Sequence, residues 1–240
     1  MAPQVALDRL RAEGVRVEIA ETDEPPAPAE PFRLADLTLP LEIWLDGLRV
    51  EDLELRTGDR PARRIDELEL AVRMDTGQFW LQRLALRTSD GGMVAQGQAR
   101  LTEALPLRLD LDWDWRLPDQ GLAAGRLRLR GDARTLTIDH RGGGELPIAL
   151  QARVRNLLDR PSWELELSWP ELTLTADEAP LVLGPGRLQS DGDLDDYRIE
   201  TEGQVSGAGA LFAEFAISTA TADQLHVDMS FIPVTQNYLV

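Results

Sequence analysis

Apolar and polar residues alternate one by one over most of the chain after Phe32. The clearest run places Leu107, Leu109, Leu111 and Trp113 between charged residues, and similar runs begin near Leu39, Leu68, Leu136, Ile148, Trp163 and Leu225. A period of two is that of a β-strand with one apolar and one polar face. Turn clusters such as Ser89–Gly92 and Pro118–Gly121 separate the runs, and no helical segment lies between them to form crossovers. The pattern therefore predicts an all-β fold with a mostly antiparallel sheet.

Leucine fills most of the apolar positions, where strand propensity alone would favour Val and Ile. One leucine-rich face continues through the repeated runs, and the sequence contains no evident second set of segments that could form an opposing sheet. The sheet must therefore curl on itself or bury its apolar face against something else.

The first part of the chain has a different pattern. Val5 to Leu10 shows a weak helical periodicity that stops before Gly14, which predicts a short helix, and residues 21–31 contain four prolines, which predicts an extended linker. We expect residues 1–31 to be this helix and linker, residues 32–233 to be the repetitive β domain, and residues 234–240 to be a tail.

The net charge of −17 is carried without a single Lys, since all 25 cationic residues are Arg. This charge opposes binding to nucleic acid, because the phosphate backbone would be repelled. The absence of Cys excludes disulfides and thiolate metal sites. No stretch has the roughly 18 to 20 apolar residues that would cross a bilayer, and the first residues do not form a signal sequence.

Candidates for catalysis are few. We expect His140 and His226 to be solvated strand residues, the acidic segment 191–196 to be a surface turn, and Gly142–Gly144 to be a hairpin loop. The prediction is therefore that the chain is not an enzyme, uses no cofactor and has no metal site.

Charged residues alternate with the leucines of two successive runs. Pairing Asp114 with Arg126, Asp112 with Arg128 and Asp110 with Arg130 across the turn at Gln120 would also place Trp113 opposite Leu127 and Leu111 opposite Leu129. Two separately solvated charged faces are the alternative.

Several segments resemble the TamB branch of the AsmA-like family of bridge-like lipid transfer proteins. These are residues 32–43 and 48–55, the Gly97–Leu101 and Leu105–Trp113 pair, and the later elements at 131–132, 136–140, 152–157, 161–163 and 169–170. The resemblance implies a long curled sheet, or β-taco, that encloses a hydrophobic groove. It also implies an internal fragment of a longer periplasmic protein of a diderm bacterium, tethered to the inner membrane by an N-terminal anchor that this sequence lacks.

The function implied is a passive conduit for phospholipid between the inner and outer membranes. The implied partners are phospholipid acyl chains, the rest of the same chain and, through C-terminal regions outside this sequence, an outer-membrane β-barrel. A structural spacer, or a scaffold for outer-membrane protein assembly with a filled core, is the alternative. The expected groove residues are Leu39, Leu41, Ile43, Leu68, Leu70, Leu107, Leu109, Leu111, Trp113, Leu127, Leu129, Leu136, Ile138, Leu150, Leu165 and Leu167.

Overall fold

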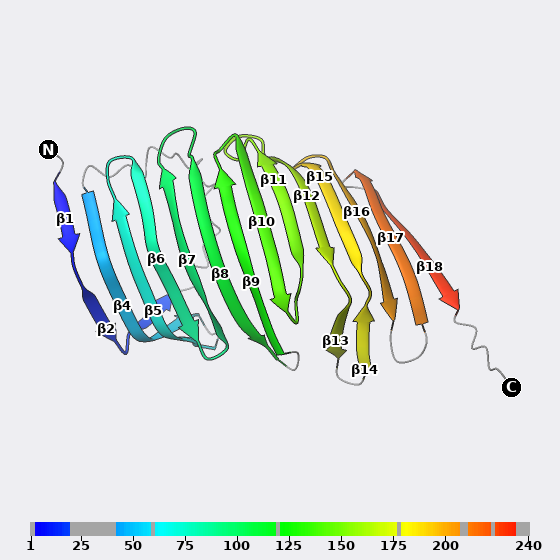
Figure 1. Cartoon of the computed structure of the whole chain (residues 1–240), viewed down its shortest axis with the longest axis horizontal. Helices are drawn as coiled ribbons and strands as arrows, with labels where there is room; N and C mark the ends of the chain where they lie inside the picture. Colours follow the sequence, from blue (N-terminus) through cyan, green and yellow to red (C-terminus); the bar gives the residue numbers. More distant parts are fainter. Residues whose placement is uncertain are drawn as a thin grey trace. The chain divides into compact units, whose positions relative to one another are not determined.

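The computed structural model describes residues 3–19, 42–58, 61–118, 121–176, 179–206, 211–221 and 224–233. All regular structure in these ranges is strand, and the 18 strands belong to one mostly antiparallel sheet (Figure 1). This confirms the all-β prediction. The described residues form no helix of the length and hydropathy needed to span a membrane. The chain divides into two compact units, Met1–Trp115 with Arg128–Asp132, and Arg116–Leu127 with Ala133–Val240.

The first unit is a meander in which each strand pairs antiparallel with the next one along the chain, from β4 to β8. Its strands are β1 (Gln4–Leu7), β2 (Leu10–Glu13), β3 (Arg16–Ile19), β4 (Glu42–Thr57), β5 (Arg63–Met74), β6 (Gln78–Thr88), β7 (Gly91–Arg100), most of β8 (Leu107–Leu117) and the end of β9 (Gly121–Gly131).

The predicted N-terminal helix is wrong, because residues 4–19 form the three short strands β1, β2 and β3. All three pair parallel with β4 at one constant offset, so that Gln4 lies opposite Glu42 and Leu10 opposite Leu48. The segment follows β4 even through an irregularity: Gly14 has a φ of 67°, and Asp52, the matching residue of β4, has a φ of 53°. Pairing with β4 satisfies more backbone groups than a single isolated helical turn could. The linker predicted at 21–31 and the tail at 234–240 lie outside the described residues.

Bulges keep the apolar residues of the first unit on one face. In β6, Leu81 pairs with Val72 and Leu84 pairs with Leu70, because Gln82 and Arg83 are accommodated in a register shift. Similar shifts occur in β4 between Leu45 and Leu48. Without them the alternation would place half of these leucines on the charged face.

The second unit is also built from antiparallel strand pairs, but not all of them join strands that are consecutive in the chain. Its strands are the end of β8, most of β9, and then β10 (Thr135–Gly144), β11 (Ala149–Arg155), β12 (Ser162–Trp169), β13 (Leu172–Ala176), β14 (Ala179–Leu183), β15 (Gly186–Asp193), β16 (Tyr197–Ser206), β17 (Leu211–Thr221) and β18 (Gln224–Pro233). β12 pairs with β15, and the hairpin of β13 and β14 is inserted between them in the sequence.

Gly142–Gly144 is not a hairpin loop as predicted but the end of β10, where Gly144 has a φ of 65°.

The β8–β9 hairpin is present, because the two strands are neighbours in the sheet. Asp110 accepts a hydrogen bond from Arg108 at 3.0 Å and lies 3.5 Å from Arg128 and 3.6 Å from Arg130. The charged faces of the two strands therefore meet. The residue-by-residue register proposed above stays a prediction.

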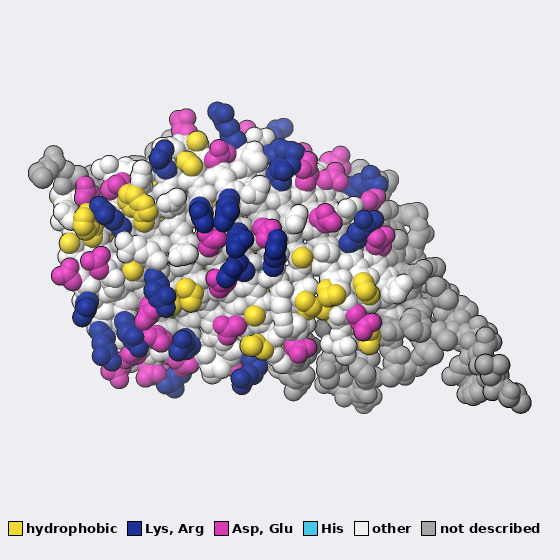
Figure 2. Space-filling model, viewed as in Figure 1, with side chains coloured by type: hydrophobic (Ala, Val, Ile, Leu, Met, Phe, Trp, Pro, Cys, Tyr) yellow, Lys and Arg dark blue, Asp and Glu magenta, His cyan; other side chains and the backbone are white. Residues whose placement is uncertain are grey.

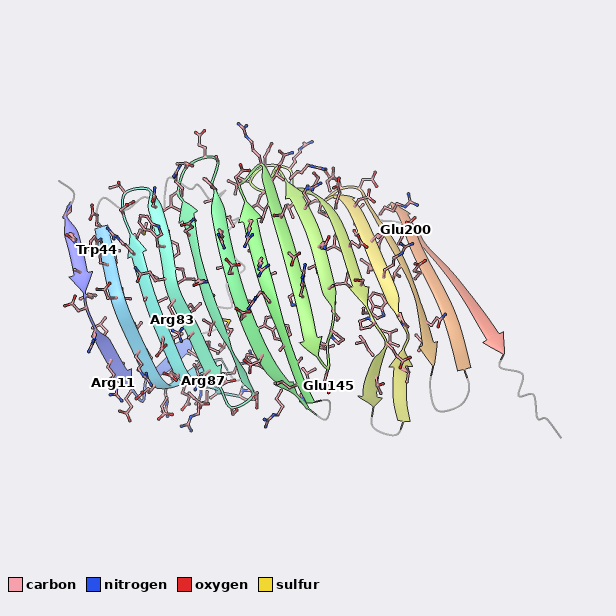
Figure 3. All side chains as sticks on the ribbon, viewed as in Figure 1. Arg11, Trp44, Arg83, Arg87, Glu145 and Glu200 are labelled. Carbon is pink, nitrogen blue, oxygen red and sulfur yellow. The ribbon has the colours of Figure 1, made fainter. Side chains whose placement is uncertain are left out.

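The polar face of the first unit carries a network of ion pairs across four strands. Arg11 bonds to Glu51 at 2.7 Å, Arg49 bonds to Glu51 and Glu69, and Arg83 bonds to Glu69 at 2.8 Å. Figure 2 shows acidic and basic side chains interspersed on the face in view, and Figure 3 labels Arg11 and Arg83. Exposed pairs of this kind contribute at most about 1 kcal/mol each, so they fix the strand register more than they stabilise the sheet.

Acid should weaken this network. The hydrogen bond from Arg83 lowers the pKa of Glu69, and those from Arg11 and Arg49 lower the pKa of Glu51. A carboxylate with a lowered pKa stabilises the fold above its unfolded-state pKa, and this contribution is lost as the pH falls through the folded-state value. We expect the urea midpoint to fall on acidification below about pH 4.5, and the fall to be smaller in Glu69→Gln.

Glu103→Gln is the matched control, because Glu103 takes part in no ion pair within the described ranges and lies in the turn after β7. Its acid profile should follow that of the unsubstituted chain. An acid profile for Glu69→Gln identical to that of Glu103→Gln would contradict the stated cause.

Candidate functional site

The apolar face of the first unit is built from four cross-strand rows. Each row contains one residue from each of β4 to β8, so that a single face crosses five strands. The rows are Ile43, Met74, Phe79, Ala99 and Leu107; Leu45, Val72, Leu81, Gly97 and Leu109; Leu48, Leu70, Leu84, Ala95 and Leu111; and Val50, Leu68, Leu86, Met93 and Trp113.

Three of the four rows have a small residue where they cross β7. β7 contributes Ala99, Gly97 and Ala95 between the large apolar side chains of β6 and β8. A Cβ at Gly97 would lie 2.6 Å from the carbonyl oxygen of Arg108 and 3.1 Å from a methyl of Leu109, so no larger residue fits there without a shift. Ala95 is only 3% exposed. In these rows the large side chains of β6 and β8 therefore project further from the sheet than the small side chains of β7.

The second unit has an equivalent face across β10, β11, β12, β15 and β16. Its rows are Leu136, Val154, Trp163, Gly192 and Tyr197; Ile138, Ala152, Leu165, Ser190 and Ile199; and His140, Leu150, Leu167, Leu188 and Thr201. The indole nitrogen of Trp163 donates a hydrogen bond to the Ser190 hydroxyl at 3.0 Å, which satisfies the one polar group of the middle row.

The side chains of these two apolar faces remain partly exposed to solvent. No large side chain in the described ranges is fully buried, and most leucines of the rows are half-buried rather than buried. In a sandwich, an apolar face packs against a second sheet about 10 Å away and its side chains are buried. Every described strand of this chain belongs instead to the same sheet. The apolar rows thus form a surface on which another apolar molecule could lie.

His140 does not have the predicted setting of a solvated strand residue. It is half-buried on the apolar face, in the row of Leu150 and Leu167. The setting of the His226 side chain lies outside the described residues. The turn predicted at residues 191–196 is confirmed only for residues 194–196, because residues 191–193 are the end of β15. The carboxylate of Asp193 accepts hydrogen bonds from the backbone N–H groups of Asp195 and Asp196 in this turn. Those bonds lower the pKa of Asp193.

A comparison with known protein families identifies the family to which this sheet belongs. The family described as "TamB, N-terminal domain" matches residues 18–230, which is most of the chain. The chain belongs to the TamB N-terminal domain family. No curated protein matches it, and no solved structure matches it. The TamB resemblance drawn from the sequence is therefore confirmed at the level of the family.

The structure brings most of the residues expected from the TamB resemblance into the apolar rows. In the first unit these are Ile43, Leu68, Leu70, Leu107, Leu109, Leu111 and Trp113, and in the second they are Leu136, Ile138, Leu150, Leu165 and Leu167. Leu129 alternates with Arg128 and Arg130, which meet Asp110 on the polar face, so it belongs to the apolar side of the first unit. Leu127 is half-buried in the part of β9 that belongs to the second unit. Leu39 and Leu41 lie outside the described residues.

Other residues of the apolar rows were missed in the sequence analysis. The most important are Phe79, Leu81, Leu84 and Leu86 of β6. Their run looks irregular because the shift at Gln82 and Arg83 breaks the alternation. Leu188 and Ile199 were missed because the next residue on the same face of each strand is polar, Ser190 in β15 and Thr201 in β16, which interrupts the apolar alternation. An interrupted alternation between two turns was the signal that could have identified these three strands.

Proposed function

We propose that the chain is a lipid-binding segment of a longer TamB-like conduit that moves phospholipid between the inner and outer membranes. The observation that carries the proposal is the apolar face of each unit, continuous over five strands and not packed against a second sheet in the described ranges. The match to the TamB family supports it independently.

The dimensions of the apolar rows suit an acyl chain. The span from Leu107 to Trp113 along β8 covers about 20 Å at about 3.4 Å per residue. One leaflet of a bilayer has a hydrocarbon depth of about 15 Å, half of a core of about 30 Å. An acyl chain that lies along the strands can therefore contact the apolar face over its full length.

The chemistry of the rows favours movement over specific capture. Burial of a methylene group is worth about 0.8 kcal/mol wherever the neighbouring surface is apolar. Leucine rows offer this burial at every position and contain few polar groups that would hold a lipid at one place. A lipid that leaves the bilayer for these rows thus exchanges one apolar environment for another, and the movement needs no catalytic residue.

Under this proposal the chain is not an enzyme, and its partners are phospholipid acyl chains and other parts of the same longer protein. An outer-membrane barrel would be reached through regions beyond these 240 residues. The setting is the periplasm of a diderm bacterium, with an anchor in the inner membrane.

Mass spectrometry of an organic extract tests the proposal. We expect the chain, secreted to the periplasm of a diderm host and purified without detergent, to carry phospholipid of several headgroup classes. An apolar fluorescent dye should compete with that lipid. A chain that carries no lipid and does not bind the dye would instead be a spacer or assembly scaffold whose face is filled by its own residues.

A further inference from the structure

One cross-strand row on the polar face of the first unit contains tryptophan, arginine and glutamine and no acidic residue, unlike the ion-pair network beside it. Trp44, Arg73, Trp80, Gln98 and Arg108 lie in register across β4 to β8. The guanidinium of Arg73 lies 3.8 Å from the ring centroid of Trp44 and 5.6 Å from that of Trp80. Figure 3 labels Trp44 near the start of β4. Arg73 thus stacks on indoles and has no carboxylate partner in the described part of the chain.

A cavity of about 250 Å³ lies at the β6–β8 end of this row. It is lined by Trp80, Gln78, Gln98, Arg100, Arg108 and Pro106, together with three small or apolar residues. No acidic residue lines the cavity, although the chain has a net charge of −17. Arg108 is held by Asp110, whereas Arg100 is exposed and makes no ion pair among the described residues. The cavity is therefore a cationic site on an acidic protein.

Backbone hydrogen bonds fix the walls of this cavity. The N–H of Arg100 donates to the carbonyl of Pro106 at 2.9 Å, and the N–H of Leu101 donates to the carbonyl of Gly77 at 2.8 Å. The Asp75 carboxylate accepts hydrogen bonds from the N–H groups of Gly77 and Gln78. The two turns beside the cavity are thus tied to each other and to the strands, and a ligand would meet a site already in shape.

The three kinds of side chain in the cavity match one class of ligand. A guanidinium binds a carboxylate or phosphate through two parallel hydrogen bonds. The carboxamides of Gln78 and Gln98 can donate to and accept from hydroxyl groups, and the indole of Trp80 offers an apolar face with a polar edge. Pockets for drug-sized molecules measure about 300 to 1,000 Å³, so this smaller cavity suits a group the size of one sugar ring.

We propose that this cavity binds an acidic sugar unit, with its anionic group on Arg100 and Arg108, its hydroxyls on the two glutamines and its ring against Trp80. The site lies on the polar face and is independent of the lipid-binding role. The partner would be a glycan that carries carboxylate or phosphate groups, which the chain could contact while its apolar face carries lipid.

Titration with glucuronic acid, glucose and inorganic phosphate, followed by tryptophan fluorescence and by NMR, tests this site. Glucuronic acid should bind at least about tenfold more tightly than glucose, which lacks the anionic group, and than phosphate, which lacks the ring. Arg100→Gln and Trp80→Leu should each weaken glucuronic acid binding about tenfold or more. Arg87→Gln should leave it unchanged, because Arg87 is an exposed arginine of the same unit that does not line the cavity (Figure 3).

Phe79 and Trp80 separate this proposal from the lipid-binding one, because they are adjacent in β6 and lie on opposite faces. Phe79→Asp should reduce lipid retention and leave glucuronic acid binding intact, whereas Trp80→Leu should do the reverse. Equal affinity for phosphate and glucuronic acid would overturn the assignment to a sugar, and so would binding of glucuronic acid that Arg100→Gln does not weaken. The absence of any saturable binding would overturn the site itself.

Discussion

Replacing Leu165 by Asp should reduce the lipid that copurifies with the chain to about a tenth or less, while lowering stability only modestly. Leu165 is half-buried in the middle row of the second unit, where its neighbours on β11 and β15 are the short residues Ala152 and Ser190. A carboxylate there loses few packing contacts and keeps access to solvent in the lipid-free chain. In the lipid-bound chain it would face hydrocarbon, and an ionised group without a partner in such a setting costs several kcal/mol. Quantitative lipid analysis together with urea unfolding measures both effects.

Ser168→Asp is the control for the added charge, because Ser168 is exposed on the polar face of β12. Its cross-strand partner on β15 is Arg187. The substitution should leave lipid content unchanged. Leu109→Asp should repeat the Leu165 result in the first unit, since Leu109 faces Gly97 on β7. Parallel losses of folding and of lipid in Leu165→Asp would point to a filled core and contradict the open face.

Replacing Leu136 by Ala should have the opposite profile, with a large loss of stability. Leu136 is 7% exposed and is one of the few well-buried apolar residues in the described ranges. Truncating a buried leucine removes its transfer free energy and leaves a cavity, and typical losses are about 2 to 5 kcal/mol. We expect about 2 to 3 kcal/mol here, because one side of the sheet can relax, as measured by urea unfolding.

Leu158→Ala is the matched truncation, because Leu158 is 51% exposed in the turn between β11 and β12. It should cost less than about 0.5 kcal/mol. A similar loss for both variants would mean that the burial of Leu136 contributes nothing particular to the fold.

The hairpins of the sheet were predictable because their information is local. Alternation in runs such as Leu107–Trp113 gives the strand and its apolar face, and Gly or Pro clusters such as Pro118–Gly121 give the turn. The network of Arg49 and the cavity at Arg100 could not be predicted, because each depends on which residues of four or five strands share a row. That register is set by bulges at positions such as Gln82 and Arg83.

The N-terminal strands were missed for a different reason. Val5, Leu7 and Leu10 fit a helical turn as well as a strand, and the partner that decides between them is β4, far along the chain. Long-range parallel pairing leaves little local signal. The setting of His140, by contrast, could have been predicted, since it continues the alternation of Leu136 and Ile138.

Photocrosslinking at consecutive positions of β12 tests the lipid-binding face most directly. A photoreactive residue would be placed in turn at Glu164, Leu165, Glu166 and Leu167, and phospholipid attached to the chain would be measured after irradiation in a diderm host. Leu165 and Leu167 lie in the apolar rows, whereas Glu164 and Glu166 lie on the polar face and are exposed. We predict strong lipid adducts at the two leucine positions and little or none at the two glutamates. Adducts of equal strength at all four positions, or at none, would contradict the account.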